Sequence, residues 1–209
     1  TPGLHKEILK RNIPFVMFDR VFRSLEVNKV LNDNLQGAYA VIQHMIEQGY
    51  SEILHLTGPL TINIYKERTD GFKEALRNHG LPVQPEYIIE KVITKEQGYE
   101  EIRKRLKSGF PFDAIFSAGD FSAQGALLCL RDMEIKVPDQ VGLAGFANEP
   151  FTAFLAPSLT TVDQRGTEMG GMVADMFLNC EEKKSLSREC EKMVLKPELI
   201  IRNSSLLNR

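Results

Sequence analysis

Short apolar runs alternate with longer amphipathic segments along most of this 209-residue chain. Residues 53–57, for example, form an apolar run closed by Gly58-Pro59, and a segment with helical periodicity follows at 65–78. Short apolar runs between turn residues are typical of buried strands, whereas apolar residues three and four apart indicate helices. Alternating strands and helices favour parallel pairing, because each helix returns the chain to the start of the next strand. The sequence therefore predicts an α/β fold with parallel, doubly wound sheets.

Turn residues mark most boundaries between the predicted elements. Asp33-Asn34 is a helix-start signal, and Gly49, Gly80 and Gly109 follow helical segments as typical stop signals. The polar run at 181–184 is expected to be a solvated loop. The predicted strands are 15–18, 53–57, 87–90, 114–117, 141–144, 159–162 and 199–201, and the predicted helices are 35–48, 65–78, 95–107, 121–133 and 165–179.

Composition narrows the class of protein. A net charge of −2 argues against DNA binding by these residues alone, because nucleic-acid binders usually carry a basic face. The sequence contains neither an apolar run long enough for a transmembrane helix nor a signal-peptide pattern. Its three cysteines are far apart, and its four histidines have no metal-ligand spacing. We expect a cytoplasmic protein with no metal site and no membrane partner.

The stretch from residue 137 to residue 164 carries the strongest functional signal. Residues 141–144 form an apolar run behind a Pro-Asp turn, which predicts a buried strand. This strand ends at the small and polar sequence Gly145-Phe-Ala-Asn148. A second predicted strand, 159–162, leads to Gln164. Because ligands of open α/β sheets bind at the carboxyl ends of strands, both ends are candidate binding positions.

These segments, taken in order, resemble the effector-binding domain of the LacI/GalR (lactose-repressor) family of bacterial transcription regulators. The resemblance covers nearly the whole chain, and each motif is weak alone but specific in combination. The motifs are Ile13-Pro-Phe-Val-Met-Phe-Asp-Arg20, Asp33-Asn-Leu-Gln-Gly37, Lys66-Glu-Arg-Thr-Asp-Gly71, Asp113-Ala-Ile-Phe116, Gly119-Asp-Phe-Ser-Ala123, Gly145-Phe146, Leu159-Thr-Thr-Val-Asp-Gln164 and Leu199-Ile-Ile-Arg-Asn-Ser-Ser205.

The resemblance implies a two-lobed, periplasmic-binding-protein-like (type I) fold with a ligand between the lobes and no cofactor. It implies a homodimer that binds operator DNA through a helix-turn-helix domain, and we expect that domain and the first part of the N-terminal lobe to be absent from this chain. The implied N-terminal lobe is about 1–49 and 163–190, and the C-terminal lobe is about 50–162 and 191–209.

The resemblance also implies that a small-molecule effector, a sugar or sugar derivative, contacts Arg68, Asp120 and Gln164. A guanidinium offers a rigid fork of donors that suits neighbouring hydroxyls, and the alternative is a surface arginine paired with Glu67 or Asp70. Asp120 could instead be a helix N-cap. Gln164 could contact the ligand or bridge the lobes. On this interpretation Arg68→Ala weakens effector binding and leaves folding nearly intact.

Four further positions complete the candidate site. Asn148 can donate and accept hydrogen bonds, as a ligand hydroxyl requires. Phe146 could offer its face to a ring or fill the core, and Tyr65 lies in a loop that could reach the ligand. Asp19 ends the first strand, where an ion pair with Arg20 is an alternative.

One position departs from the family pattern and bears on the ligand. The family often has an aspartate after the Gly-Phe pair, and this chain has Ala147, which removes a carboxylate able to bind paired sugar hydroxyls. A periplasmic sugar-binding protein of a transport system is the alternative function, since it would share the fold. An enzyme has little support, because no Ser–His–Asp order, GxSxG motif or phosphate-binding loop is present.

Overall fold

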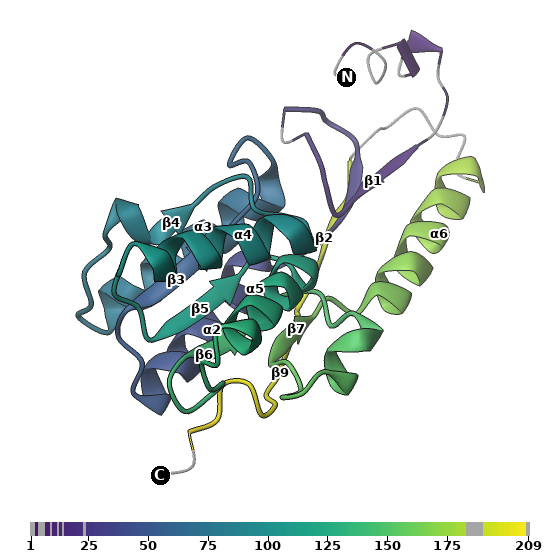
Figure 1. Ribbon diagram of the computed structural model, residues 1–209. Coiled ribbons are helices and arrows are strands. Elements are labelled where there is room, and N and C mark those ends of the chain that lie inside the picture. Colours follow the sequence, from purple (N-terminus) through teal and green to yellow (C-terminus); the bar gives the residue numbers. More distant parts are fainter. Residues whose placement is uncertain are drawn as a thin grey trace. The chain divides into compact units, whose positions relative to one another are not determined.

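The computed structural model divides the chain into two compact units, which are described separately below (Figure 1). Unit 1 comprises Thr1–Asp33 and Arg165–Lys196, and unit 2 comprises Asn34–Gln164 and Pro197–Arg209. The structure describes residues 15–22, 24–182 and 190–207 together with positions 3, 7, 8, 10, 11 and 13, and it leaves out the side chains of 180–182.

Unit 2 is built on a four-stranded sheet with the strand order β4-β3-β5-β6. Every pair of neighbours in this sheet is parallel, as the alternation of strands and helices predicts. A short antiparallel pair, β7 with β9, belongs to the same unit. The strands are β3 (Ile53–Leu56), β4 (Ile88–Ile89), β5 (Ala114–Ser117), β6 (Gly142–Ala144), β7 (Thr161–Asp163) and β9 (Glu198–Ile200).

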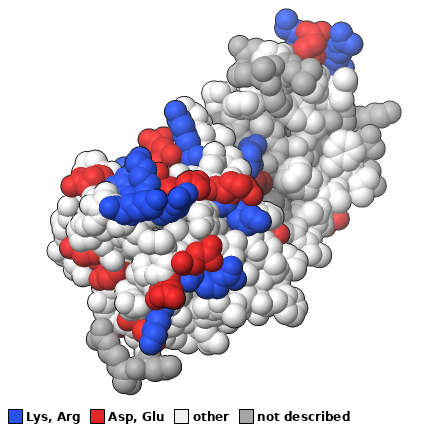
Figure 2. All heavy atoms as spheres, viewed as in Figure 1, with Lys and Arg blue, Asp and Glu red and all other residues white. Residues whose placement is uncertain are grey.

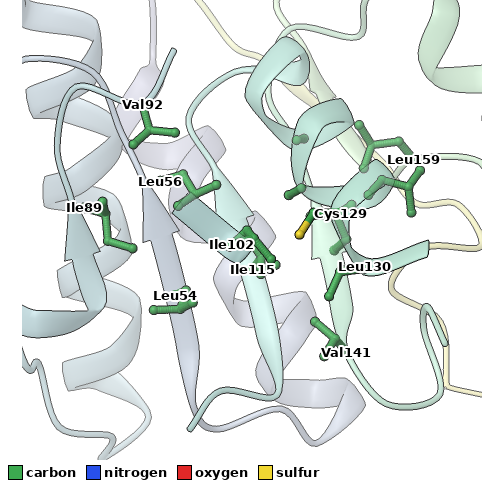
Figure 3. Close-up of a cluster of buried hydrophobic side chains, with 14 of the residues drawn as sticks. Leu54, Leu56, Ile89, Val92, Ile102, Ile115, Cys129, Leu130, Val141 and Leu159 are labelled. Carbon is green, nitrogen blue, oxygen red and sulfur yellow. The ribbon is translucent and has the colours of Figure 1, made fainter. Parts of the chain in front are cut away.

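Helices cover both faces of this sheet, which confirms the doubly wound prediction. Strand residues alternate between the faces, because successive side chains of a strand point to opposite sides. Leu54 and Ile115 join the cluster packed by one helix pair (Figure 3), and Ile53 and Phe116 join the cluster packed by the other. The first pair is α4 (Lys95–Lys107) with α5 (Asp120–Asp132), and the second is α2 (Asn34–Gln48) with α3 (Asn63–Asn78).

Glycine allows the helices of each pair to approach closely. A Cβ at Gly125 of α5 would overlap the carbonyl oxygen of Lys95, the first residue of α4. A Cβ at Gly71 of α3 would likewise overlap the carbonyl oxygen of Leu35 in α2. Any side chain at either position would therefore push two backbones apart.

Unit 1 contains a three-stranded parallel sheet with the order β1-β2-β8. The long helix α6 packs on it, and Met169 and Met176 of α6 are buried with Val30 and Leu195. The sequence prediction included β1 and α6 and missed β2 and β8. The elements are β1 (Val16–Phe18), β2 (Asn28–Asn32), β8 (Lys192–Leu195) and α6 (Gly166–Glu182).

The division between the units differs from the expected lobe boundaries. The first boundary was expected near residue 49, and the chain enters unit 2 at Asn34 instead. The reason is that α2 packs on α3 and on the unit 2 sheet, with Val41, Ile42 and Met45 buried in the same cluster as Phe72. The other boundaries fall after Gln164 and after Lys196, where 162 and 190 were expected.

Several local features of the chain were also predicted from the sequence. The predicted strand at 87–90 is a short 3₁₀ turn, Pro85–Tyr87, followed by the two residues of β4. Cys129 is buried, as expected for a packed thiol, and Cys190 is exposed. The side chain of Cys180 lies outside those described. The loop predicted at 181–184 is wrong for its first two residues, since α6 continues to Glu182, and positions 183 and 184 lie outside the described residues. Among the described residues, no helix is both long enough and apolar enough to cross a membrane.

Candidate functional site

The candidate site lies in unit 2 at the carboxyl ends of β5 and β6, together with the segment that follows β7. Parallel strands end at the same edge of their sheet, so the segments that follow them come together there. Helix α3 begins at Asn63, after a short loop that follows β3, and it brings Arg68 to this edge. The side chains at the edge are nevertheless more buried than a sequence-based interpretation suggests.

Arg68 is only 3% exposed, and its guanidinium bonds to three segments of unit 2. Nε donates to Asn34 Oδ1 at 2.9 Å, Nη1 to the carbonyl oxygen of Ala118 at 2.7 Å, and Nη2 to Gln164 Oε1 at 2.9 Å. The guanidinium carbon also lies 3.7 Å from the centroid of the Phe146 ring. Arg68 is therefore a buried connector of the site, not the surface arginine of the alternative interpretation.

The two acidic neighbours proposed as partners of Arg68 bond elsewhere. Glu67 accepts a hydrogen bond from Asn34 Nδ2 at 3.1 Å. Asp70 pairs with Lys66 one turn earlier on α3, at 2.6 Å. Asn34 thus bonds to both Glu67 and Arg68, and this first residue of α2 is part of the site, although its sequence position suggested only a helix start.

Asp120 is 1% exposed and holds the strand ends together. Its carboxylate accepts the backbone N–H of Glu149 at 2.9 Å and the hydroxyl of Thr161 at 2.7 Å. Burial raises the pKa of this carboxyl above its ordinary value, and the hydrogen bonds to Glu149 and Thr161 act in the opposite direction. The N-cap of α5 is Gly119, so the alternative role of Asp120 as N-cap is wrong.

Asn148 follows β6 in the left-handed region, with φ of 53°. Its Nδ2 donates to Asp163 Oδ2 at 3.0 Å, and its Oδ1 accepts from Arg202 Nη2 at 2.8 Å. Its backbone N–H donates to Thr161 Oγ1, the same hydroxyl that bonds to Asp120. The side chain is half-buried, and a ligand would have to share or replace these partners.

Four predicted site residues remain: two are buried, one is half-buried, and one belongs to unit 1. Phe146 is fully buried in the α2–α3 cluster, so it fills the core. Tyr65 is 7% exposed and packs over Gly58, with Ile64 and Ala118 in the same cluster. Gln164 is half-buried and bonds to Arg68. Asp19 belongs to unit 1, where its backbone N–H donates to the carbonyl oxygen of Val30 at 3.2 Å.

The structure therefore brings together two linked groups in unit 2. One is Arg68 with Phe146, Gln164 and Asn34, and the other is Asp120 with Asn148 through Thr161. The sequence analysis missed Asn34, Thr161 and Arg202, because nothing in their local sequence indicates which distant residues they meet. Among the described residues, no group of three or more histidine, cysteine, aspartate or glutamate side chains could hold a metal ion.

Comparison with known proteins identifies the family. A model of the periplasmic binding protein-like domain matches residues 42–205. The chain belongs to this family of periplasmic binding protein-like domains. It is 30% identical over 193 residues to the transcriptional repressor PurR of Actinobacillus pleuropneumoniae serotype 3, and 32% identical over 201 residues to the transcriptional regulator DegA of Bacillus subtilis. These relatives are named as transcriptional regulators, not as enzymes.

The match with these two relatives covers nearly all of this chain but only part of theirs. It spans 92% of this chain and 57% of PurR, and 96% of this chain and 58% of DegA. Among solved structures, the transcriptional regulator CelR in complex with cellobiose superposes with a TM-score of 0.89 and 26% identity. That superposition covers 97% of this chain and 62% of CelR. The chain therefore spans less than two thirds of the length of each of these proteins.

Proposed function

We propose that this chain is the effector domain of a LacI-family transcription regulator. It would bind a sugar or sugar derivative and thereby modulate the binding of operator DNA in the cytoplasm. The observation that carries the proposal is the cluster around Arg68, where hydrogen-bonding side chains gather at the carboxyl ends of parallel strands. The cellobiose bound to CelR supports a sugar as the chemical class. The DNA-binding domain of the regulator would be a helix-turn-helix domain outside these 209 residues.

Two half-buried amides are the proposed contact points for the effector. Gln164 and Asn148 each carry a donor and an acceptor, which suits sugar hydroxyls. Arg68 and Asp120, being almost fully buried, would act by holding these amides and the β6–β7 strand ends in place. Tyr65 and Asp19 remain proposed contacts, and Ala147 makes the ligand set differ from that of aspartate-bearing members.

The charge distribution supports a separate DNA-binding part. On the face seen in Figure 2, basic and acidic side chains are intermixed, and the net charge is −2. Because phosphate contacts dominate DNA affinity, these residues alone should not bind an operator. A sequence-specific, salt-sensitive gel shift with the 209-residue chain would contradict this part of the proposal.

Exposed aromatic side chains support a homodimer. Phe154 is 87% exposed and Phe121 is 51% exposed, and the ring of Phe121 lies 5.2 Å from that of Phe151. Exposed aromatic groups of this kind are typical of protein interfaces. We propose that a second copy of the chain covers them. Phe154→Asp should shift sedimentation from dimer toward monomer, and an unchanged distribution would exclude Phe154 from the interface.

A thermal-shift and calorimetry series tests the effector assignment. The chain would be titrated with cellobiose, ribose, other mono- and disaccharides, sugar phosphates and nucleobases. We expect a carbohydrate to raise the melting temperature, and Gln164→Met to weaken its binding by roughly tenfold, the loss of one hydrogen bond. Gln43→Met is the matched control, because Gln43 lies on α2 and bonds to Glu47. A nucleobase as the sole binder would overturn the sugar assignment.

A further inference from the structure

The chain passes between its two units at three peptide bonds. These bonds join Asp33 to Asn34, Gln164 to Arg165, and Lys196 to Pro197. We call the residues around them crossing segments 1, 2 and 3 (31–37, 160–168 and 193–200). A conformational change in unit 1 can pass to unit 2 through the covalent chain only by way of these three segments.

Arg68 bonds directly to the unit 2 ends of crossing segments 1 and 2. Asn34 is the first residue of unit 2 after the first crossing, and it accepts the hydrogen bond of Arg68 Nε at 2.9 Å. Gln164 is the last residue of unit 2 before the second crossing, and it accepts the bond of Arg68 Nη2 at 2.9 Å. One buried guanidinium thus joins two residues that lie far apart in the sequence.

Crossing segment 3 lies beside Gly37 of crossing segment 1, next to the ring that stacks on Arg68. The Phe146 ring lies under Arg68, 3.7 Å from the guanidinium carbon. The edge of that ring and Cγ of Pro197 flank Gly37, and each lies 3.0 Å from the point where a Cβ of residue 37 would stand. Pro197 is the first residue of unit 2 after the third crossing. Crossing segments 1 and 2 therefore bond to Arg68 directly, and crossing segment 3 borders the same cluster at Gly37.

We propose that Arg68 is a positioning residue that couples the three crossing segments, so that a displacement of one changes the other two. A guanidinium suits this task because its donors point in fixed, different directions within one plane and its face can stack on a ring. A lysine ammonium in the same place could not reach three acceptors in this arrangement. At 3% exposure, water has little access to replace the lost bonds. The coupling belongs to the ligand-free chain, so its test does not depend on the proposed effector.

Arg105 provides a matched control in the same unit. Its Nε donates to Glu101 at 3.0 Å, its Nη1 donates to the carbonyl oxygen of Glu86 at 3.2 Å, and its guanidinium carbon lies 4.7 Å from the centroid of the Phe110 ring. The chemistry is the same as at Arg68, but these partners lie within 86–110, away from the three crossing segments.

Hydrogen–deuterium exchange of the full 209-residue chain without ligand tests the coupling. In Arg68→Lys we expect amide exchange to become roughly tenfold faster in all three crossing segments together, because local opening there loses a shared anchor. The amide of Asp33 is a suitable probe, since it donates to the carbonyl oxygen of Leu195. Arg105→Lys should accelerate exchange only around 86–110. Faster exchange confined to one segment in Arg68→Lys would overturn the proposal.

A second variant keeps the test decisive if Arg68→Lys fails to fold. Gln164→Met removes only the acceptor at the second crossing. We expect faster exchange of residues 31–37, which Gln164 reaches through Arg68, and little change in Gln43→Met. Unchanged exchange of 31–37 in Gln164→Met would show that Arg68 does not transmit the change, and the proposal would fail.

Discussion

A pair of helices covers each face of the unit 2 sheet, but the buried side chains on the two faces differ in polarity. The α4–α5 face is a continuous apolar cluster that includes Leu54, Ile102 and Leu130 (Figure 3). The α2–α3 face also has an apolar cluster, but His55 and Arg68 are buried on this side, at 0% and 3% exposure. An apolar face needs the right volume, whereas buried polar groups need particular partners in the right place.

His55 shows which partners a polar side chain needs when it is buried on the α2–α3 face. Its ring is stacked between Phe72 and Phe116, with centroid distances of 4.8 and 4.9 Å. One ring nitrogen meets the carbonyl oxygen of Phe116 at 3.2 Å, so it must carry the proton, and the other meets the hydroxyl of Thr69 at 3.0 Å. Burial lowers the pKa of His55 to about 3, so the ring is neutral at ordinary pH. Four substitutions test this difference between the two faces.

The largest effect is expected on the apolar face, from Gly125→Ala. The new Cβ would overlap the carbonyl oxygen of Lys95, so α4 and α5 must move apart, at a cost of about 3 kcal/mol or more. Urea unfolding would measure the loss. Gly170→Ala on α6 is the control, since the described residues leave open space there and alanine should stabilise the helix by about 1 kcal/mol. Equal stabilities for the two variants would mean that the helix pair does not depend on this contact.

On the polar face, Arg68→Ala should reduce the free energy of unfolding by about 3 kcal/mol, because Asn34, Ala118 and Gln164 each lose a charge-assisted bond. The sequence interpretation expected folding to stay nearly intact, and the burial of Arg68 is the reason for the change. Arg105→Ala should cost less, since its partners are closer to solvent. Chemical denaturation of both variants decides this, and a smaller loss for Arg68→Ala than for Arg105→Ala would reverse our ranking.

The next effect depends on pH. The pKa of His55 is lowered on folding, so between pH 6.5 and about 3 the unfolded chain binds a proton that the folded chain does not. His55 therefore stabilises the fold above pH 6.5 and loses about 1.4 kcal/mol of that stabilisation per pH unit below it. In His55→Gln this contribution to the pH slope should vanish. Parallel pH profiles for the two proteins would show that His55 is not buried neutral.

The smallest effect on stability is expected for Ala147→Asp. Residue 147 is half-buried with φ of 138°, a backbone conformation that is strained for alanine and aspartate alike, so the change should stay within about 0.5 kcal/mol. Its effect should appear in ligand preference, because it adds a carboxylate beside Asn148. Calorimetry with the same sugar panel tests this, and identical ligands and affinities would place residue 147 outside the pocket.

The local sequence was sufficient for most elements of unit 2, although β4 is shorter than predicted. Strand β5 and helix α4 have the predicted bounds, and the apolar positions of α5 are buried as predicted. Their periodicity and turn residues are contained within each segment, so no distant contact is needed to recognise them. The parallel pairing of the strands was predicted from their alternation with helices. The family resemblance was recognised from the order of the motifs along the chain.

Only the tertiary structure decided how β2 and β8 form and what the site residues do. β2 is mostly polar, and it becomes a strand because Val30 and Leu31 pair with Met193 and Val194 more than 160 positions away. Arg68 looked like a ligand-binding or surface arginine because its acceptors, Asn34 and Gln164, are separated from it by 34 and 96 positions. A sequence states which donors a side chain has. The fold decides which acceptors reach them and whether water can compete, and that decision makes Arg68 a buried connector.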